Sequence, residues 1–158
     1  MHRGVLSMSG QLHAAEEDKY IGLECQVPLV DMFRFNKLLV GASWMGEYGN
    51  PDIPEEWAYI KSYSPYHNRH KDVHYPKVFF TTSTRDDQVH SGHARKMVIK
   101  MKDIGIDVLY YENNEGGHAG AADNNQAAEL NSMAFAYLIT AVTIIATEFT
   151  YFNKLAAN

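Results

Sequence analysis

The sequence predicts an α/β protein, a parallel sheet flanked by helices, and two observations carry this prediction. First, residues 92–104 place apolar side chains every three or four positions, and this one-sided helix lies between two short apolar segments, 76–82 and 107–111. A strand, a helix and a strand at this spacing form a right-handed crossover between parallel strands. Second, polar turns at 83–89 and 113–120 follow the two strands, at the positions where open α/β sheets place their sites.

Length and composition favour a single globular domain. The chain has 158 residues, of which 46% are apolar and 21% are charged, as in ordinary globular proteins. The formal net charge of −5 and the absence of Lys/Arg runs argue against binding to nucleic acid or to an anionic membrane surface. The single cysteine, Cys25, lies in an apolar run and is interpreted as a small buried side chain rather than a nucleophile.

Local signals predict the elements that precede the crossover. A short strand is expected over Gly22–Val27, because Pro28 cannot donate to a sheet ladder and ends it. The segment Asp31–Asn50 mixes aromatic residues, Met and Gly without steady periodicity, which predicts a loop with helical turns. Pro51–Tyr63 is predicted to be a helix whose first turn carries proline and two glutamates. A weaker pattern predicts one or two helical turns over Gln11–Tyr20.

The C-terminal part, Ala121–Thr147, is rich in Ala, Leu and Met and predicts one or two helices that cover the sheet. Within it, Leu130–Thr147 carries no charge. Polar residues interrupt this stretch and an α/β pattern precedes it, so we expect a buried helix rather than a membrane span. No continuous apolar segment of the kind found in secretory signals is present near the start of the sequence, and the expected location is cytoplasmic.

Asp86 and His118 are the candidate catalytic pair, because a carboxylate and a histidine follow the ends of successive strands. A carboxylate bound to one imidazole nitrogen fixes the tautomer and leaves the other nitrogen free to accept a proton from a nucleophile. The glycines at 116, 117 and 120 allow turns that present the ring at the rim of the sheet. The alternative interpretation is structural, in which Asp86 caps the helix that begins near His90 and His118 is an exposed loop residue.

Five short motifs occur in order along residues 21–138. They are CQVPLVDM (25–32), ASWMGEYG (42–49), YSPYHN (63–68), TRDDQV (84–89) and EGGH (115–118). In this order they resemble the C-terminal part of the catalytic domain of the prolyl oligopeptidase family of serine peptidases.

The resemblance implies a partial α/β-hydrolase fold and a serine-type peptidase that cleaves peptide bonds, after proline, through an acyl-enzyme. At the matching positions, Asp86 is the triad member that orients the histidine, and His118 is the general base. The resemblance also implies that the ring of Trp44 stacks on the substrate proline and that Tyr48 lies in the same pocket. Without the resemblance, Trp44 would be interpreted as a core residue.

Two features depart from the family pattern. Family members commonly carry Arg two positions after the triad Asp, where it holds a substrate carbonyl. In this sequence the position is Gln88, whose side chain has no charge and lacks the forked N–H donors of a guanidinium group. The second departure is the nucleophile, which belongs on a Gly-x-Ser-x-Gly turn upstream of the first strand. Ser7, Ser9 and Ser43 all lack that glycine spacing, so the isolated chain is expected to be inactive.

The missing nucleophile leads to a prediction about domain organisation. Residues 1–20 form a non-matching segment, residues 21–150 form the C-terminal part of a peptidase α/β-hydrolase domain, and residues 151–158 form a tail. We expect a truncated reading frame or a fragment that begins after the nucleophile. The competing interpretation is an inactive remnant, or a module that binds prolyl peptides or a partner through Trp44 and Tyr48.

The expected partners are a proline-containing peptide and a polypeptide that covers the exposed edge of the strand Gly22–Val27. That polypeptide is either a second copy of the chain or the missing N-terminal part of the enzyme. No cofactor is expected, because no dinucleotide or phosphate-binding glycine motif is present. A metal site is not expected either, since neither cysteine nor a His-Glu-x-x-His motif accompanies the spaced histidines. Those histidines are His67, His70, His74, His90 and His93.

Overall fold

The computed structural model describes residues 22–69 and 75–156 of the chain. In this part of the chain, parallel strands form one sheet in the order β1 (Gly22–Gln26), β2 (Lys77–Ser83) and β3 (Val108–Asn113). The predicted parallel sheet is therefore confirmed. The segment 1–20, with the helical turns predicted over Gln11–Tyr20, lies outside the described residues.

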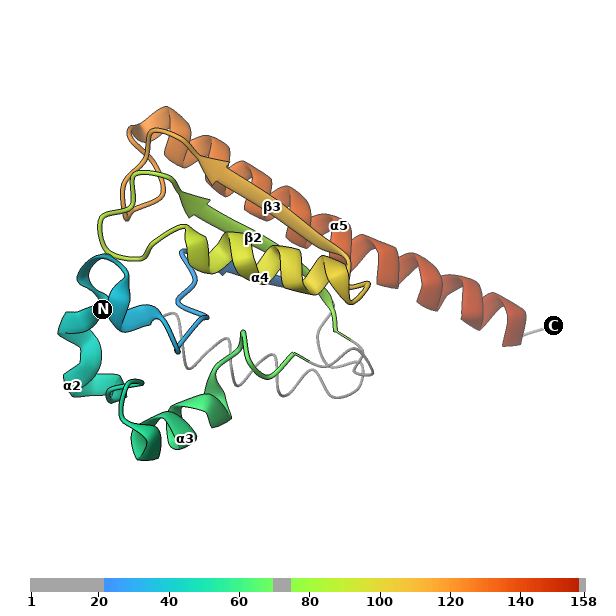
Figure 1. Ribbon diagram of the computed structural model, residues 1–158. Helices are drawn as coiled ribbons and strands as arrows, with labels where there is room; N and C mark the ends of the chain where they lie inside the picture. The colour runs from blue at the N-terminus through green and yellow to red at the C-terminus, as the bar shows by residue number, and fades with distance from the viewer. Residues whose placement is uncertain (1–21, 70–74, 157–158) are drawn as a thin grey trace.

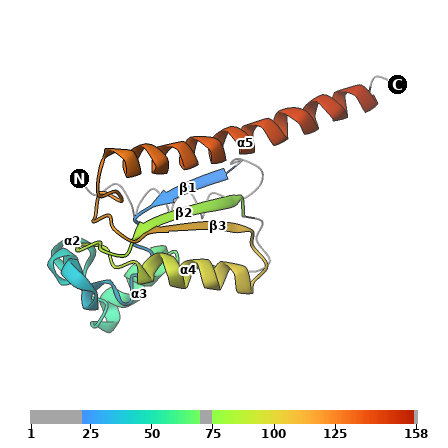
Figure 2. The same cartoon turned by 90° about the horizontal axis from the view of Figure 1, so that it is seen from above.

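Helices cover both faces of the sheet (Figure 1). The crossover helix α4 (Gly92–Asp103) packs on one face, and the long helix α5 (Asn124–Ala156) packs on the other (Figure 2). α4 corresponds to the helix predicted over 92–104. Gly105 follows it with a φ of 82°, a left-handed conformation that glycine adopts without strain and that ends the helix.

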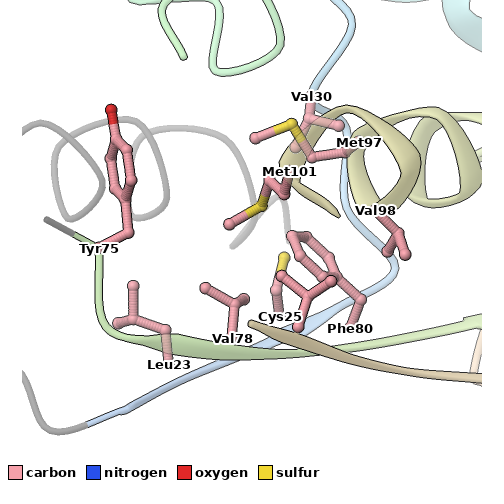
Figure 3. Close-up of a cluster of buried hydrophobic side chains, with 10 residues drawn as sticks. Leu23, Cys25, Val30, Tyr75, Val78, Phe80, Met97, Val98 and Met101 are labelled. Carbon is pink, nitrogen blue, oxygen red and sulfur yellow. The ribbon is translucent and has the colours of Figure 1, made fainter. Parts of the chain in front are cut away.

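The core between the sheet and α4 is built from alternate residues of the strands (Figure 3). Leu23 and Cys25 of β1 pair in register with Val78 and Phe80 of β2, and these side chains point toward α4. Cys25 is buried as a small apolar side chain, as predicted. The α4 side of this core is formed by Met97, Val98 and Met101.

The segment between β1 and β2 folds as short helices around a second apolar cluster, here called the Phe35 cluster. The helices are η1 (Phe35–Lys37), η2 (Leu39–Trp44), α2 (Met45–Tyr48) and α3 (Pro54–Tyr63). The buried members of the Phe35 cluster are Leu29, Met32, Phe35, Ile60 and Val89. The first three helices agree with the predicted loop with helical turns, and α3 falls within the helix predicted over Pro51–Tyr63.

α5 is a helix as predicted, but the expectation that its uncharged stretch is buried is wrong. Ala134 and Tyr137 are buried, whereas Phe135 and Ile139 are each 64% exposed. α5 lies on the sheet with one face, so the side chains on its other face are exposed, and the helix also extends past the end of the sheet (Figure 2). α5 also continues without a break across residue 150. Among the described residues, no helix combines the length and apolarity needed to cross a membrane.

Tyr137 fixes α5 on the sheet through its hydroxyl group. The hydroxyl oxygen accepts the backbone N–H of Leu23 at 3.2 Å, and the hydroxyl donates to the carbonyl of Lys77. It therefore bridges the beginnings of β1 and β2. Gly22 leaves the space for this contact, because a Cβ atom there would lie 2.6 Å from the Tyr137 hydroxyl oxygen.

Candidate active site

The turns after β2 and β3 lie side by side, because the two strands are parallel neighbours. The backbone N–H of Thr84, directly after β2, donates to the carbonyl of Asn113 at the end of β3 over 2.8 Å. Asp86 follows in the first turn and His118 in the second. The rule that parallel strands bring their C-terminal ends to one edge of a sheet therefore correctly predicts that these turns meet.

Asp86 and His118 are hydrogen-bonded. Both carboxylate oxygens of Asp86 lie 3.1 Å from Nδ1 of His118. The Asp86 side chain is fully buried and that of His118 is 40% exposed. Because a carboxylate can only accept, Nδ1 of His118 carries the proton, and in the neutral ring Nε2 is the nitrogen that can accept one.

The turn after β2 holds Asp86 in place. Its Oδ1 atom accepts the backbone N–H groups of Gln88 at 2.8 Å and Val89 at 2.9 Å. Asp86 thus caps its own turn, while α4 begins later, at Gly92. The alternative interpretation, in which Asp86 caps that helix, is therefore wrong, because Ser91 stands at the N-cap of α4 and no side chain makes a capping bond there. Asp86 instead closes its own turn and binds His118.

The turn that carries His118 is closed by hydrogen bonds to Asn113. The N–H of Gly120 donates to the carbonyl of Gly117 at 2.9 Å, which makes a tight turn with His118 inside it. The Asn113 side chain, 4% exposed, bonds to main-chain groups on both sides of this turn. Sequence reasoning missed Asn113, and the available signal was an asparagine that ends a strand just before a glycine-rich turn.

Substitutions at the adjacent glycines 116 and 117 are expected to differ sharply. A Cβ atom at Gly116 would lie 2.5 Å from the carbonyl oxygen of Gly120, whereas one at Gly117 meets only the Arg85 carbonyl, at 4.0 Å. Gly116→Ala should therefore lower the free energy of unfolding by about 2 kcal/mol. Gly117→Ala should change it by less than about 1 kcal/mol. Urea denaturation of both variants measures this difference, and equal effects would contradict the close approach of Gly116 to the carbonyl of Gly120.

An ion-pair network braces the outer side of the two turns. Arg95 of α4 binds both carboxylate oxygens of Glu112, and Thr84 donates its hydroxyl to the same carboxylate at 2.6 Å. The hydrogen bonds from Arg95, followed by the one from Thr84, outweigh burial and lower the pKa of Glu112 to about 2. Glu112 therefore stays ionised at neutral pH and keeps Thr84 beside the end of β3.

The predicted substrate residues lie around the Phe35 cluster. Trp44 and Tyr48 are half-buried against this cluster, which also contains Val89 from the turn of Asp86. The ring of Tyr48 packs edge-on against Phe35 with centroids 5.8 Å apart, and burial raises the pKa of its hydroxyl. Gln88 is exposed on the Asp86 turn. The aromatic segment and the Asp86 turn thus share one packing unit, although no hydrogen bond among the described residues joins Trp44 or Tyr48 to His118.

Within the described residues, no serine is hydrogen-bonded to His118. The hydroxyl of Ser43 donates to the carbonyl of Val40 at 2.7 Å, and Ser7 and Ser9 lie outside the described residues. A different Ser-His pair exists, with the hydroxyl of Ser64 2.8 Å from Nδ1 of His67. Ser64 is 0% exposed, so this pair braces the chain after α3 and cannot meet a substrate.

The described histidines, cysteine and carboxylates form no group of three that could hold a metal ion. His70 and His74, two of the spaced histidines, lie outside the described residues.

A shallow hollow lies beside the His118 turn, between the sheet and the beginning of α5. Its empty volume is about 500 Å³, including space open to solvent. It is lined by Gln26 and Val27 after β1, by Thr81 and Thr82 of β2, by residues 119–121, and by Ala127, Leu130 and Asn131 of α5. The hollow therefore adjoins both the residue after His118 and the end of β1, the strand at the edge of the described sheet.

Comparisons with known proteins agree with this geometry. The family model described as the prolyl oligopeptidase family matches residues 7–143 and so begins inside the segment 1–20. The chain is 47% identical over 121 residues to the uncharacterized peptidase y4nA of Sinorhizobium fredii, covering 77% of this chain and 17% of that protein.

Solved structures give the same result. A structure from a study of two prolyl endopeptidases aligns with a TM-score of 0.81 and 30% identity, over 87% of this chain and 21% of that one. Prolyl oligopeptidase B from Galerina marginata, bound to a 35mer hydrolysis and macrocyclization substrate, aligns with a TM-score of 0.62 and 28% identity, over 67% of this chain and 15% of that one. The chain thus spans less than a fifth of the length of y4nA and matches the C-terminal portion of a peptidase domain. Its fold is part of the α/β-hydrolase fold of these enzymes, and the chain belongs to the prolyl oligopeptidase family of serine peptidases.

Proposed function

We propose that this chain provides the aspartate and the histidine of a Ser-Asp-His catalytic triad. The observation that carries the proposal is the contact of both oxygens of the buried Asp86 with Nδ1 of the part-exposed His118. In this arrangement Asp86 fixes the ring and stabilises the imidazolium ion. Nε2 of His118 takes the proton from a serine as it attacks the peptide carbonyl, and then returns it to the leaving amine. Water, activated by the same nitrogen, hydrolyses the acyl-enzyme.

The proposed substrate is a peptide cleaved after proline. Trp44 and Tyr48 are half-buried aromatic side chains beside the Phe35 cluster, and aromatic rings of this kind suit an apolar group such as a pyrrolidine ring. Gln88 is exposed next to Asp86 and can donate one hydrogen bond to a substrate carbonyl. The lack of a charged, forked donor at this position favours weaker binding of the peptide than an arginine would give.

We propose that the nucleophile comes from a polypeptide segment that lies along the open edge of β1. A strand added parallel to β1 would end near Gln26 and Val27, which line the hollow beside the residue after His118. A serine on the turn after that strand would then lie within reach of the imidazole. This partner is the preceding part of a peptidase domain, and a second copy of the chain is the competing occupant of the same edge.

A chimera tests the proposed function. Residues 22–143 replace the corresponding segment of the prolyl endopeptidase whose structure aligns with a TM-score of 0.81, so that the rest of that enzyme supplies the serine. We expect the chimera to hydrolyse a chromogenic Ala-Pro peptide and to react with a fluorophosphonate probe. The chain by itself is expected to show neither, because triad members act as a unit and the loss of one costs about a millionfold in rate.

Two outcomes would contradict the proposal. One is fluorophosphonate labelling of Ser7, Ser9 or Ser43 in the isolated chain, because it would identify a different nucleophile. The other is a folded chimera without turnover, combined with binding of a proline peptide to the isolated chain that quenches Trp44 fluorescence. That combination would favour a binding module. Replacing Trp57, the other tryptophan, by phenylalanine leaves Trp44 as the source of the tryptophan fluorescence.

A further inference from the structure

Asn113 uses every hydrogen-bonding site of its side chain at the end of β3. Its Nδ2 donates to the carbonyl of Gly120 at 2.9 Å and to Oε1 of Gln126 at 2.8 Å. Its Oδ1 accepts the N–H groups of Glu115 at 2.9 Å and Gly116 at 3.2 Å. A buried amide satisfied in this way is held rigidly, because each contact it gives up leaves a polar group unpaired.

These contacts enclose His118. Gly116 precedes the histidine by two residues and Gly120 follows it by two, so the Asn113 amide ties together the two sides of the turn that carries the ring. The main chain of Asn113 also contacts the turn that carries Asp86, the other member of the catalytic pair. The carbonyl of Asn113 accepts the N–H of Thr84 at 2.8 Å, where the turn of Asp86 begins.

Gln126 connects this unit to α5. Its Oε1, besides accepting from Asn113, accepts the N–H of Ala122 at 3.0 Å, and its Nε2 donates to the carboxylate of Glu115 at 2.6 Å. The N–H of Gln126 itself bonds to the side chain of Asp123, which caps the first turn of the helix. The His118 turn is therefore held between the end of a strand and the first turn of a long helix.

We propose that Asn113 is a positioning residue for the catalytic pair, and that it sets the place and orientation of His118 relative to Asp86. This inference rests on the proposed function for its catalytic meaning, but the geometry that it predicts exists in the chain without activity. Without the Asn113 amide, Gly116 and Gly120 lose their common partner and the imidazole is no longer held with Nδ1 toward Asp86. The proton then redistributes between the two ring nitrogens.

Nitrogen NMR of the histidine rings in the full chain measures directly how the proton of His118 is distributed between Nδ1 and Nε2. Long-range proton–nitrogen spectra report which ring nitrogen carries the proton, and a His118→Gln sample identifies the signals of His118. In the unmodified chain we expect the Nδ1-protonated tautomer to dominate at neutral pH. In Asn113→Ala the ratio of Nδ1-protonated to Nε2-protonated ring should fall about tenfold, the change that follows when one charge-assisted hydrogen bond is lost.

Two further variants make the result decisive. Asn114→Ala is the matched control. The Oδ1 of this exposed neighbour lies 3.2 Å from the hydroxyl of Thr84, which donates to Glu112 at 2.6 Å, so the substitution should leave the ratio unchanged. Gln126→Ala removes one partner of Asn113 from the surface of α5 and should lower the ratio by about threefold, between the two other variants.

The inference is overturned if folded Asn113→Ala keeps the tautomer ratio of the unmodified chain. If Asn113→Ala does not fold, an unchanged ratio in Gln126→Ala overturns it. Neither result depends on turnover, so the tautomer measurement and the chimera test of the proposed function can fail independently of each other.

Discussion

Replacing Asp86 by asparagine in the active chimera is expected to lower kcat by about 10⁴-fold, with the fold retained. The asparagine side chain can keep the bonds from Gln88 and Val89, but its NH₂ group can face His118 and stabilise the tautomer with the proton on Nε2. That nitrogen then cannot accept the serine proton. Replacing His118 by alanine removes the base altogether, and a loss of at least the same size is expected.

Asp87→Asn is the control for this experiment. Asp87 is the exposed neighbour of the buried Asp86 and has the same change of charge on substitution. Its kcat should stay within about threefold of the parent chimera, since surface substitutions have small effects. The measurement is steady-state hydrolysis of an Ala-Pro chromogenic peptide. A large loss in Asp87→Asn with activity kept in Asp86→Asn would reverse the assignment of the triad carboxylate.

Acidification from pH 6.5 to pH 4 is expected to destabilise the chain through His93. This histidine of α4 is 1% exposed, and its Nδ1 accepts the backbone N–H of Asp31 at 3.1 Å. Burial lowers its pKa to about 4, against the opposing charge of Asp31 and with smaller contributions from His90 and Lys96. The ring is therefore neutral in the folded chain down to about pH 4, whereas in the unfolded chain it takes a proton below about pH 6.5.

The direction in which stability changes with pH follows from proton binding in the folded and unfolded states. Between pH 6.5 and pH 4 the unfolded state binds more protons at this site, so the stability contributed by His93 is complete above pH 6.5 and is lost as the pH falls to 4. The loss is about 3 kcal/mol. Urea denaturation at several pH values measures it. His93→Asn keeps an acceptor for the Asp31 N–H but cannot titrate, so its stability should fall much less over this range.

His90→Asn is the matched control for the acid experiment. His90 lies three residues earlier, is only half-buried, and also uses Nδ1 to accept a backbone N–H, from Gly92. The variant should keep most of the pH dependence of the unmodified chain, because burial is the largest cause of the lowered pKa of His93. If His90→Asn flattens the curve and His93→Asn does not, the buried histidine is not the source of acid sensitivity.

The sequence predicts the sheet and its crossover helix because these elements have strong local signals. The apolar spacing of α4 and the β-branched and aromatic strands beside it favour a right-handed crossover between parallel strands. The meeting of Asp86 and His118 follows in turn from the edge rule for parallel strands. The burial of α5 could not be predicted in the same way, since an uncharged helix on one side of a sheet is covered only on the face that contacts it. Phe135 lies on the other face and is exposed, although its neighbour Ala134 is buried.

The contacts of Asn113 and Gln126 are beyond sequence reasoning for a different reason. Each amide bonds to main-chain groups whose positions are determined only when the turn between β3 and α5 closes. An asparagine before a glycine-rich turn has many possible partners, and periodicity does not distinguish them.

The hydroxyl of Tyr137 has a consequence for the order in which the chain assembles. It joins the start of the first described strand to the last described helix, residues 114 positions apart in the sequence. On a ribosome, β1 and β2 can pair before α5 is made, but the beginning of β1 stays without this bridge until synthesis has passed residue 137. A nascent chain stopped before that point should therefore expose the first residues of β1 to chaperones and proteases, and completion of α5 should end that exposure.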